Sequence, residues 1–308
     1  MRWIPENTKI DFINNRRWAY LFSAILTIVS LTSLAVQQLA WGIDFTGGVV
    51  IQVTYPQPVE LDNVRAALAK GGYGDAMVQF FGTSSDILIR TDVEKGKKNA
   101  AISDEVLAAL HAANSKADMQ RVQFIGPQVG DELANRGGLA LLYALIGILI
   151  YVLVRFHWKL AVGAVVAVFH DVIITLGFFS LFQIDFDLTV LAAVLAVIGY
   201  SVNDSVVVFD RIRENFPRMR KATAVEVMNA SINQTLARTI MTGVSTLMVL
   251  IILLVLASET LGGFAIALLV GLIFGTYSSV FIASAFSADL NVTKEDLFPP
   301  KEEASKPH

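Results

Sequence analysis

Six long apolar segments constrain the fold of this chain more than any other feature. They span residues 18–39, 137–154, 160–182, 188–209, 239–258 and 261–288. A helix needs about 20 apolar residues to cross the roughly 30 Å hydrocarbon core of a bilayer, and each segment is near or above that length. Charged residues make up 17% of the chain, below the roughly 25% of soluble domains. The sequence therefore predicts a multi-pass α-helical membrane protein with six transmembrane helices.

The distribution of Lys and Arg predicts the orientation of these helices. Positive residues concentrate in residues 1–17, 155–159 and 210–238 and are absent from the connections 183–187 and 259–261. Short loops rich in Lys and Arg remain on the cytoplasmic side. We therefore expect cytoplasmic tails at residues 1–17 and 289–308. The region 40–136 is then extracytoplasmic, because long domains are translocated largely regardless of their charge.

Residues 40–136 form a polar region with strong turn signals. Strands are predicted at 49–55, 76–82, 86–91 and 118–126, and helices at 61–70 and 99–114. We expect a hairpin turn at 83–85, between the second and third strands. The order β-α-β-β-α-β is that of an α+β ferredoxin-like domain. It contains no catalytic or metal-ligating pattern, so the sequence favours a binding or lever role for this domain.

A carboxylate inside the fourth apolar segment is the clearest candidate for function. Asp204 lies seven residues before Arg211, which places it roughly 10 Å deep at about 1.5 Å per residue. An ionised carboxylate at helix centre costs about 2.5–3.5 kcal/mol on insertion scales, and such residues mark ion pathways. Tyr200 and Ser201 lie one turn back and could hydrogen-bond it, and Asn203 could orient it or simply pack. The alternative is a structural carboxylate that caps a neighbouring helix.

Arg238, at the start of the fifth segment, is a candidate partner for this carboxylate. Its side chain can reach toward a carboxylate about one and a half turns deep, although an interfacial anchor is the alternative interpretation. Thr242 lies one turn further along the same helix face, and Gln234 one turn before. These residues could line a polar cavity in the cytoplasmic half of the membrane.

The third and sixth segments carry two further patterns. His170 and Asp171 lie near the middle of the third, either as a hydrogen-bonded structural pair or as a second proton-accepting station, since His titrates near neutrality. The sixth carries small residues spaced by four, which allow another helix to approach closely: Gly263, Ala267, Gly271, Gly275, Ser279 and Ala283. The chain has no Cys, and we expect neither a metal site nor a cofactor.

Several long motifs resemble the SecF signatures of the SecD/SecF family of protein-export membrane proteins. They are WGIDFTGG (41–48), FIGPQVG (124–130), FHDVIITLG (169–177), VIGYSVNDSVVVFDRIREN (197–215) and NQTLARTIMTG (233–243). The resemblance covers essentially the whole chain. It implies membership of the resistance-nodulation-division superfamily and a place in the bacterial cytoplasmic (inner) membrane.

The resemblance also implies partners and site residues. A SecF-type half pairs with a SecD-like subunit beside the Sec translocon channel of SecY, SecE and SecG, and acts on unfolded exported polypeptide. By motif match, Asp204 corresponds to the family's essential intramembrane carboxylate, Arg238 to its basic partner and Thr242 to a threonine of the same relay. Asp171 has weaker support from the motif.

The predicted function is that of an accessory translocase subunit that uses the proton-motive force to promote polypeptide export. Withdrawal of Arg238 would favour protonation of Asp204, and its return would favour release of the proton. The alternatives are half of a proton-driven small-molecule exporter of the same superfamily, an intramembrane aspartyl protease using Asp171 and Asp204, and a structural scaffold. We expect no enzymatic activity. The net charge of −3 favours no nucleic-acid partner.

Overall fold

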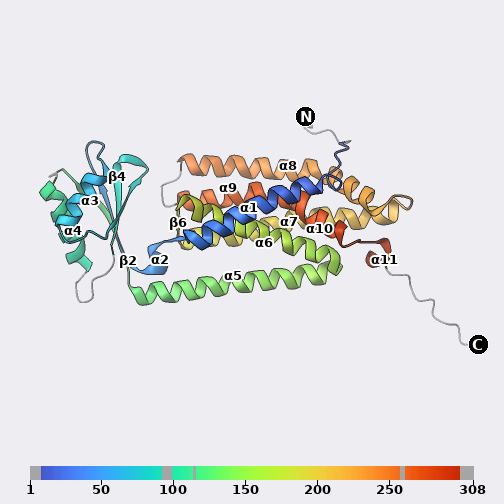
Figure 1. Cartoon of the computed structure of the whole chain (residues 1–308), viewed down its shortest axis with the longest axis horizontal. Coiled ribbons are helices and arrows are strands. Elements are labelled where there is room, and N and C mark those ends of the chain that lie inside the picture. Colours follow the sequence, from blue (N-terminus) through green and yellow to red (C-terminus); the bar gives the residue numbers. More distant parts are fainter. Residues whose placement is uncertain (1–7, 92–98, 114–115, 257–260, 299–308) are drawn as a thin grey trace, which may run out of the picture.

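The computed structural model describes residues 8–91, 99–113, 116–256 and 261–298. Residues 1–7 and 299–308, which belong to the two predicted cytoplasmic tails, lie outside the described residues. So do residues 259 and 260 of the predicted connection 259–261. The chain forms a long helical bundle with a small α/β domain at one end (Figure 1). The first membrane helix begins at the end of the bundle that lies away from this domain, and the last membrane helix ends there.

The helices of the bundle confirm the predicted six transmembrane segments. They are α1 (Arg16–Val36), α5 (Pro127–Arg155), α6 (Trp158–Phe182), α7 (Leu188–Arg218), α8 (Ala224–Leu256) and a last span made of α9 (Gly262–Ser278), the π-helix η2 (Ser279–Ala283) and α10 (Ser284–Asp289). Each is long and apolar enough to cross a membrane. A short α11 (Lys294–Leu297) follows.

Three of these helices run beyond the apolar segments. α5 begins at Pro127, where the fixed φ of proline suits a first helical position and its missing N–H is not needed. α7 continues through a charged stretch, in which Asp210 accepts a hydrogen bond of 2.5 Å from Arg155. α8 begins at Ala224, well before its apolar segment. The length of an apolar segment matches the thickness of the bilayer. The helix itself can be longer, because its backbone hydrogen bonds can continue where the chain enters water.

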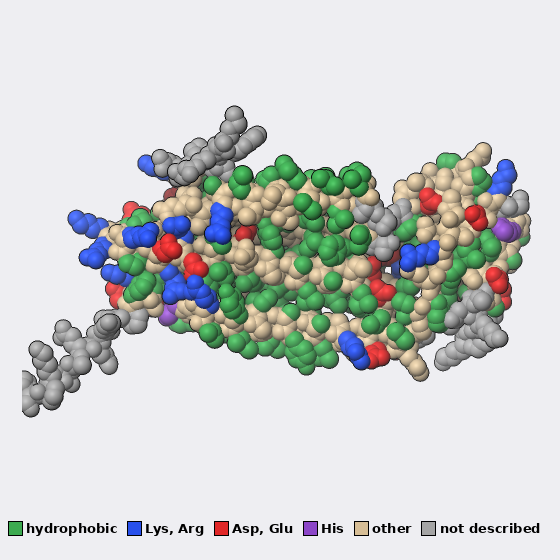
Figure 2. Space-filling model, turned by 180° about the vertical axis from the view of Figure 1, so that it is seen from behind, with side chains coloured by type: hydrophobic (Ala, Val, Ile, Leu, Met, Phe, Trp, Pro, Cys, Tyr) green, Lys and Arg blue, Asp and Glu red, His purple; other side chains and the backbone are tan. Residues whose placement is uncertain are grey.

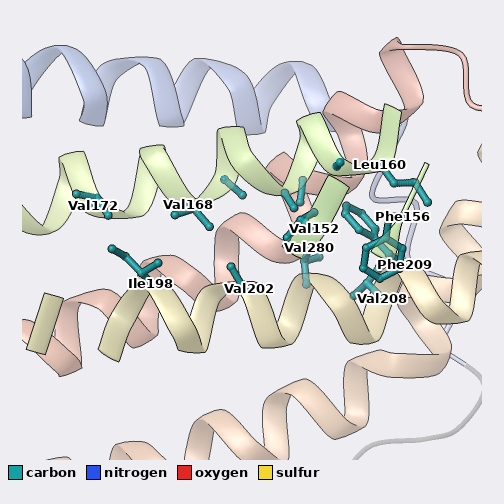
Figure 3. Close-up of a cluster of buried hydrophobic side chains, with 14 of the residues drawn as sticks. Val152, Phe156, Leu160, Val168, Val172, Ile198, Val202, Val208, Phe209 and Val280 are labelled. Atoms are coloured by element: carbon teal, nitrogen blue, oxygen red, sulfur yellow. The ribbon is translucent and has the colours of Figure 1, made fainter. Parts of the chain in front are cut away.

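The centre of the bundle is formed by α6, α7 and the last span. Its apolar core includes Phe156 and Phe209, whose rings meet edge to face with centroids 5.6 Å apart (Figure 3). A Cβ atom added at Gly271 would lie 2.1 Å from a Cγ of Val197, so α9 and α7 are in close backbone approach there. The stripe of small residues therefore packs against α7, as its spacing predicts.

The outer surface of the bundle is largely apolar. Exposed aliphatic and aromatic side chains cover α1, α5 and α8, and Figure 2 shows hydrophobic side chains along the middle of the face of the bundle that it presents. Such a surface matches the hydrocarbon region of a bilayer. Lys and Arg gather at the end of the bundle away from the α/β domain (Figure 2).

The α/β domain lies between α1 and α5 in sequence and has the predicted ferredoxin-like order. Its elements are β2 (Gly48–Thr54), α3 (Leu61–Lys70), β3 (Met77–Phe81), β4 (Thr83–Thr91), α4 (Asn99–Ala113) and β5 (Asp118–Ile125). The strands form one antiparallel sheet in the order β3-β4-β2-β5. α3 and α4 cover the sheet face away from the bundle (Figure 1), and their apolar residues build a separate core with Val49, Ile51 and Ile89.

The hairpin between β3 and β4 differs from its prediction. The predicted turn residues 83–85 belong to β4, and the chain reverses at Gly82, whose φ is +78°. Phe81 and Thr83 then face each other directly. Glycine adopts this left-handed conformation without steric cost, which allows the reversal at one residue. The Thr83 hydroxyl donates to Asp86 at 2.7 Å and steadies the start of β4.

A compact junction attaches the domain to the bundle. β1 (Ala40–Trp41) pairs in parallel with β6 (Asp185–Phe186) in the α6–α7 connection, and α2 (Ile43–Thr46) follows β1. Gly48 has a φ of +131°, which L side chains rarely adopt. A Cβ at Gly130, near the start of α5, would lie 2.7 Å from the Gly47 nitrogen. The motif WGIDFTGG (41–48) therefore brings together the C-terminal ends of α1 and α6 and the start of α5.

Candidate functional site in the membrane

Asp204 lies on α7 in the bundle interior, with 3% of its surface exposed. Its Oδ2 atom is buried and has no hydrogen-bond partner within the described part of the chain. The hydroxyls of Tyr200, one turn earlier, and of the adjacent Ser205 are also buried without partners. A buried polar group left unpaired is destabilising by about 1–3 kcal/mol, so these groups need an explanation beyond packing. Asp204 caps no helix here, and the structural interpretation finds no support.

The predicted partner residues lie on α8, which packs against α7. Arg238 is exposed and forms no ion pair within 4.0 Å of Asp204, both being described residues. Thr242 is exposed, and its hydroxyl donates to the Arg238 carbonyl at 3.0 Å. Exposed Gln234 accepts a 3.0 Å hydrogen bond from the Asn215 amide of α7. The structure thus places the predicted relay residues on adjacent helices, and the Asp204 carboxylate and the Arg238 guanidinium are not in direct contact.

Asn203, beside Asp204, is exposed at the surface of α7. It forms no side-chain hydrogen bond with any described residue, and it does not orient Asp204 in this structure. Like Arg238 and Thr242, it presents a polar group at the surface of an otherwise apolar bundle.

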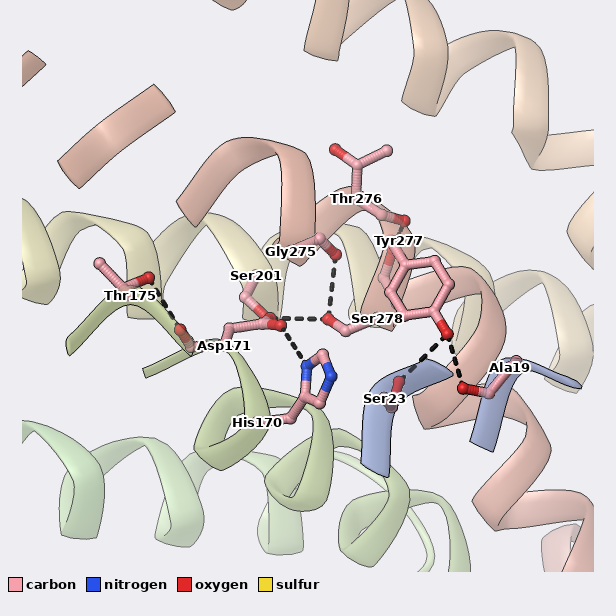
Figure 4. A network of polar contacts seen from close by, with 11 residues as sticks. Ala19, Ser23, His170, Asp171, Thr175, Ser201, Gly275, Thr276, Tyr277 and Ser278 are labelled. Carbon is pink, nitrogen blue, oxygen red and sulfur yellow. Dashed lines mark hydrogen bonds and ion pairs between the residues drawn. The ribbon is translucent and has the colours of Figure 1, made fainter. Parts of the chain in front are cut away.

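Asp171, on α6, sits in a different environment (Figure 4). It is fully buried, and its carboxylate contacts polar side chains from α6, α7 and α9. The Ser201 hydroxyl of α7 and the Ser278 hydroxyl of α9 each donate to Oδ2 at 2.6 Å. Nδ1 of His170 lies 2.9 Å from Oδ1. The carboxylate therefore joins α6, α7 and α9 at one point.

The network extends toward α1 through Tyr277 of α9. The Tyr277 hydroxyl donates to the Ala19 carbonyl at 2.8 Å and lies 3.1 Å from the Ser23 hydroxyl (Figure 4). The ring of His170 lies 6.2 Å from that of Tyr277, and its Nε2 atom is buried without a partner among the described residues. The π-helix η2 begins directly after Ser278, and π-turns are frequent at functional sites.

Sequence reasoning missed part of this network. It assigned Ser201 to Asp204, three residues away on α7, whereas the hydroxyl donates to Asp171. It did not single out Tyr277 or Ser278; the available signal was the run of four polar side chains in TYSS (276–279), inside an apolar span. Asp171 and Asp204 form no hydrogen bond with each other, so they lack the shared-proton geometry of an aspartyl-protease dyad.

Fold and site together define a class of protein: a multi-pass membrane transport subunit with a ferredoxin-like domain after its first helix and a buried, unpaired carboxylate in its fourth. Two family descriptions match the chain: the SecD/SecF GG motif over residues 32–59 and the C-terminal region of the protein-export membrane proteins SecD/SecF over residues 105–293. The chain belongs to the SecD/SecF family and groups with its SecF members.

Relatives along the full length support this assignment. The protein translocase subunit SecF of Pseudomonas aeruginosa is 50% identical over 95% of both chains. That of Vibrio alginolyticus is 46% identical over 96% of this chain and 94% of its own. These relatives are translocase subunits, which places the chain in a transport class and not in an enzyme class.

Solved structures share the fold. SecDF from Thermus thermophilus, a translocon-associated membrane protein, has a TM-score of 0.85 and 32% identity over 94% of this chain. A super-membrane-facing form of SecDF has a TM-score of 0.70 and 33% identity. The present chain spans 39% of the length of either SecDF chain.

Proposed function

We propose that this chain is the SecF subunit that, together with a SecD subunit, uses the proton-motive force to promote polypeptide export across the bacterial cytoplasmic membrane. The observation that carries the proposal is the buried Asp204, with an acceptor oxygen that no described residue satisfies. An intramembrane carboxylate in this state suits reversible protonation. The alternative of a small-molecule exporter half has no comparable support, since the full-length relatives are protein translocase subunits.

The distribution of charge supports an orientation with both tails in the cytoplasm. Arg155 ends α5, Lys159 lies in the first turn of α6, and Arg211 and Arg213 lie in the last part of α7. The connection between α5 and α6 lies at the end of the bundle away from the α/β domain (Figure 1), which is the end where Lys and Arg gather (Figure 2). Positive loops remain in the cytoplasm. In this orientation the α/β domain, within residues 40–136, lies outside the membrane on the far side, where an emerging polypeptide would meet it.

The exposed polar groups of α7 and α8 support a SecD partner. Asn203 of α7 and Arg238 and Thr242 of α8 are exposed polar residues on membrane-spanning helices. Polar and ionisable side chains within the membrane face a bundle interior or a water-filled cavity, not lipid. A second six-helix half would cover them, and a longer single SecDF chain provides the precedent. Contact with the SecY, SecE and SecG channel is part of the proposal, and only membership of the family supports it.

The mechanism requires that α8 move relative to α7. Approach of the Arg238 guanidinium stabilises the Asp204 carboxylate and releases its proton, whereas withdrawal favours proton uptake. Each elementary charge that crosses the membrane supplies about 2.3 kcal/mol per 100 mV. That energy is sufficient to bias two arrangements of packed helices, which the domain outside the membrane would then follow.

The test is Asp204→Asn in the complex with SecD, reconstituted in vesicles with the translocation channel. We expect proton flux and the proton-dependent part of export to fall more than tenfold, because the amide cannot take up and release a proton. Asp210→Asn, on the same helix but outside the apolar segment, is the matched control and should retain both. Normal flux and export in Asp204→Asn at wild-type abundance would exclude the relay and favour the scaffold alternative.

A further inference from the structure

A cavity of about 520 Å³ lies between the α/β domain and the helical bundle. One wall is the sheet face that α3 and α4 leave uncovered, and the other comes from the α6–α7 connection and Gly263 of α9 (Figure 1). Sites that hold drug-sized ligands measure about 300–1,000 Å³. The cavity can therefore hold a short stretch of extended chain but not a folded domain.

The sheet wall presents side chains in two rows that cross the strands. The registers give one row of Gln79, Leu88, Gln52 and Arg121, and a second of Arg90, Val50 and Gln123. Each row thus places one aliphatic side chain among amide and guanidinium groups, at the spacing of neighbouring strands, about 4.8 Å.

Most of the free hydrogen-bonding capacity of the cavity lies on this sheet wall. Gln52, Gln123 and Arg121 form no side-chain hydrogen bond or ion pair with any described residue, and the Nε atom of Arg90 is buried without a partner there. The facing carboxylates are already engaged. Asp185 accepts from Arg90 at 2.6 Å and from Gln79 at 3.2 Å.

The neighbouring Asp187 is engaged as well, because it caps α7 by accepting from the Val190 N–H at 2.8 Å. The third carboxylate of the lining, Asp44, accepts from the Leu188 N–H at 3.0 Å. Each carboxylate of the lining therefore already accepts a hydrogen bond, which does not favour a cationic ligand. A small anion could use Arg121 but would leave the amide acceptors unused.

A peptide group matches the unused groups of the wall. A glutamine amide both donates and accepts, as does a peptide group, while a carbonyl oxygen satisfies a guanidinium N–H. Val50 and Leu88 offer apolar contact between these polar positions. Recognition of main-chain groups in an extended segment gives affinity with little dependence on sequence.

We propose that this cavity binds a short extended segment of the exported polypeptide through its main-chain amides. The inference rests on the proposed export function and adds to it the place where the polypeptide touches this subunit. In this arrangement the segment lies between the domain and the membrane surface, so a movement of the domain relative to the bundle acts directly on the bound chain.

The first test is site-specific photocrosslinking in the complex of the full chain with SecD and the channel. A photoreactive residue at Gln52 or Gln123 faces the cavity, and one at Asp62 of α3, whose side chain is 90% exposed, is the control on the covered side. With an arrested export intermediate and no proton gradient, we expect cross-links to the polypeptide at Gln52 and Gln123 and not at Asp62. Absence of cross-links at both cavity positions, or equal yields at all three, would overturn the proposal.

The second test measures binding of a fluorescently labelled unfolded peptide to the same complex by anisotropy. The double variant Gln52→Leu/Gln123→Leu keeps side-chain size and removes the amides, and should weaken binding about tenfold, as the loss of two neutral hydrogen bonds predicts. Gln57→Leu, at an exposed position outside the cavity, should leave binding unchanged. Unchanged binding in a double variant that unfolds at the wild-type temperature would contradict the proposal.

These results are separable from those of the proton relay. Cross-linking and peptide binding are measured without a proton gradient, so failure of the Asp204→Asn prediction leaves them interpretable. Conversely, missing cross-links in a complex that shows proton-dependent export would reject the cavity as a polypeptide site and leave the export function intact.

Discussion

Asp171 and Asp204 are both buried carboxylates, yet their surroundings are opposite. Asp171 accepts from two hydroxyls and lies next to an imidazole nitrogen, whereas an oxygen of Asp204 has no partner among the described residues. A satisfied carboxylate holds its neighbours in one geometry. An unsatisfied one gains from a new contact, such as a proton or an approaching cation. At the residue scale, we therefore propose that Asp171 is a structural contact point between helices and that Asp204 is the residue that takes up and releases a proton.

Asp296, in the short helix after the last membrane span, provides a pH-dependent prediction. A hydrogen bond from Lys159 and one from the Thr293 N–H lower the pKa of Asp296 from its ordinary 3.8 to about 2. A lowered folded-state pKa stabilises this contact above the unfolded value, and the stabilisation is lost as the pH falls through about 2. We expect a carboxyl ¹³C titration in detergent to give an apparent pKa nearer 2 than 3.8.

The matched variant for this prediction is Lys159→Met, which keeps the aliphatic stem and removes the ammonium donor. The apparent pKa of Asp296 should then move up toward 3.8. A titration identical to that of the wild type would show that Lys159 does not stabilise this carboxylate in solution.

At the element scale, close approach of α7 and α9 depends on the small residues of α9. The Cβ of an alanine at Gly271 would collide with Val197. Such overpacking typically costs about 1–3 kcal/mol, so Gly271→Ala should lower the thermal unfolding temperature in detergent. Gly147→Ala on α5, where a Cβ would meet nothing within 4 Å, should be neutral or stabilising by up to about 1 kcal/mol. Equal effects of the two substitutions would contradict tight α7–α9 packing.

Elements were more predictable from the sequence than their contacts. Apolar length alone predicts six spans, and α3 was predicted at its observed bounds because helical spacing ends at a glycine pair. The ends of α5 and α7 were not, since apolar length does not record how far a helix continues into water. The β1–β6 pairing was also beyond reach, because two-residue strands joined across 145 positions leave no local pattern.

The same limit applies to the candidate site. An intramembrane carboxylate is visible in a sequence, because its cost in lipid marks it. Whether Ser201 donates to Asp171 or to Asp204 depends on the rotation of α7 against α6, which packing sets. The exposed positions of Arg238 and Thr242 could not be predicted either, since both residues were expected to line a polar cavity in the cytoplasmic half of the membrane.

At the scale of the whole molecule, one ion pair connects the domain to the bundle across the cavity. Arg90 of β4 and Asp185 of the α6–α7 connection meet at 2.6 Å, with 16% and 26% of their side chains exposed. A hydrogen bond to a charged group contributes about 1.5–3 kcal/mol. Arg90→Ala should therefore loosen the domain and broaden the distance distribution between spin labels on Asp62 of α3 and Leu181 of α6.

The charge reversal Arg90→Asp/Asp185→Arg should narrow the distribution again, which separates loss of the ion pair from damage to the sheet. An unchanged distribution in Arg90→Ala would mean that β1–β6 and the glycine-rich junction alone fix the domain. Arg90→Ala should leave the apolar core of the domain, around Ile51 and Ile89, intact.

The direct connection of β5 to α5 has a consequence for how the length of this protein can vary. Only Gly126 separates the strand from a helix of 29 residues, roughly 44 Å long at about 1.5 Å per residue. Each residue added to or removed from α5 turns its end by about 100° and would swing the sheet away from the α6–α7 connection. The length of α5 thus determines how the domain is rotated about the helix axis. Only insertions or deletions close to a whole number of turns would preserve this orientation.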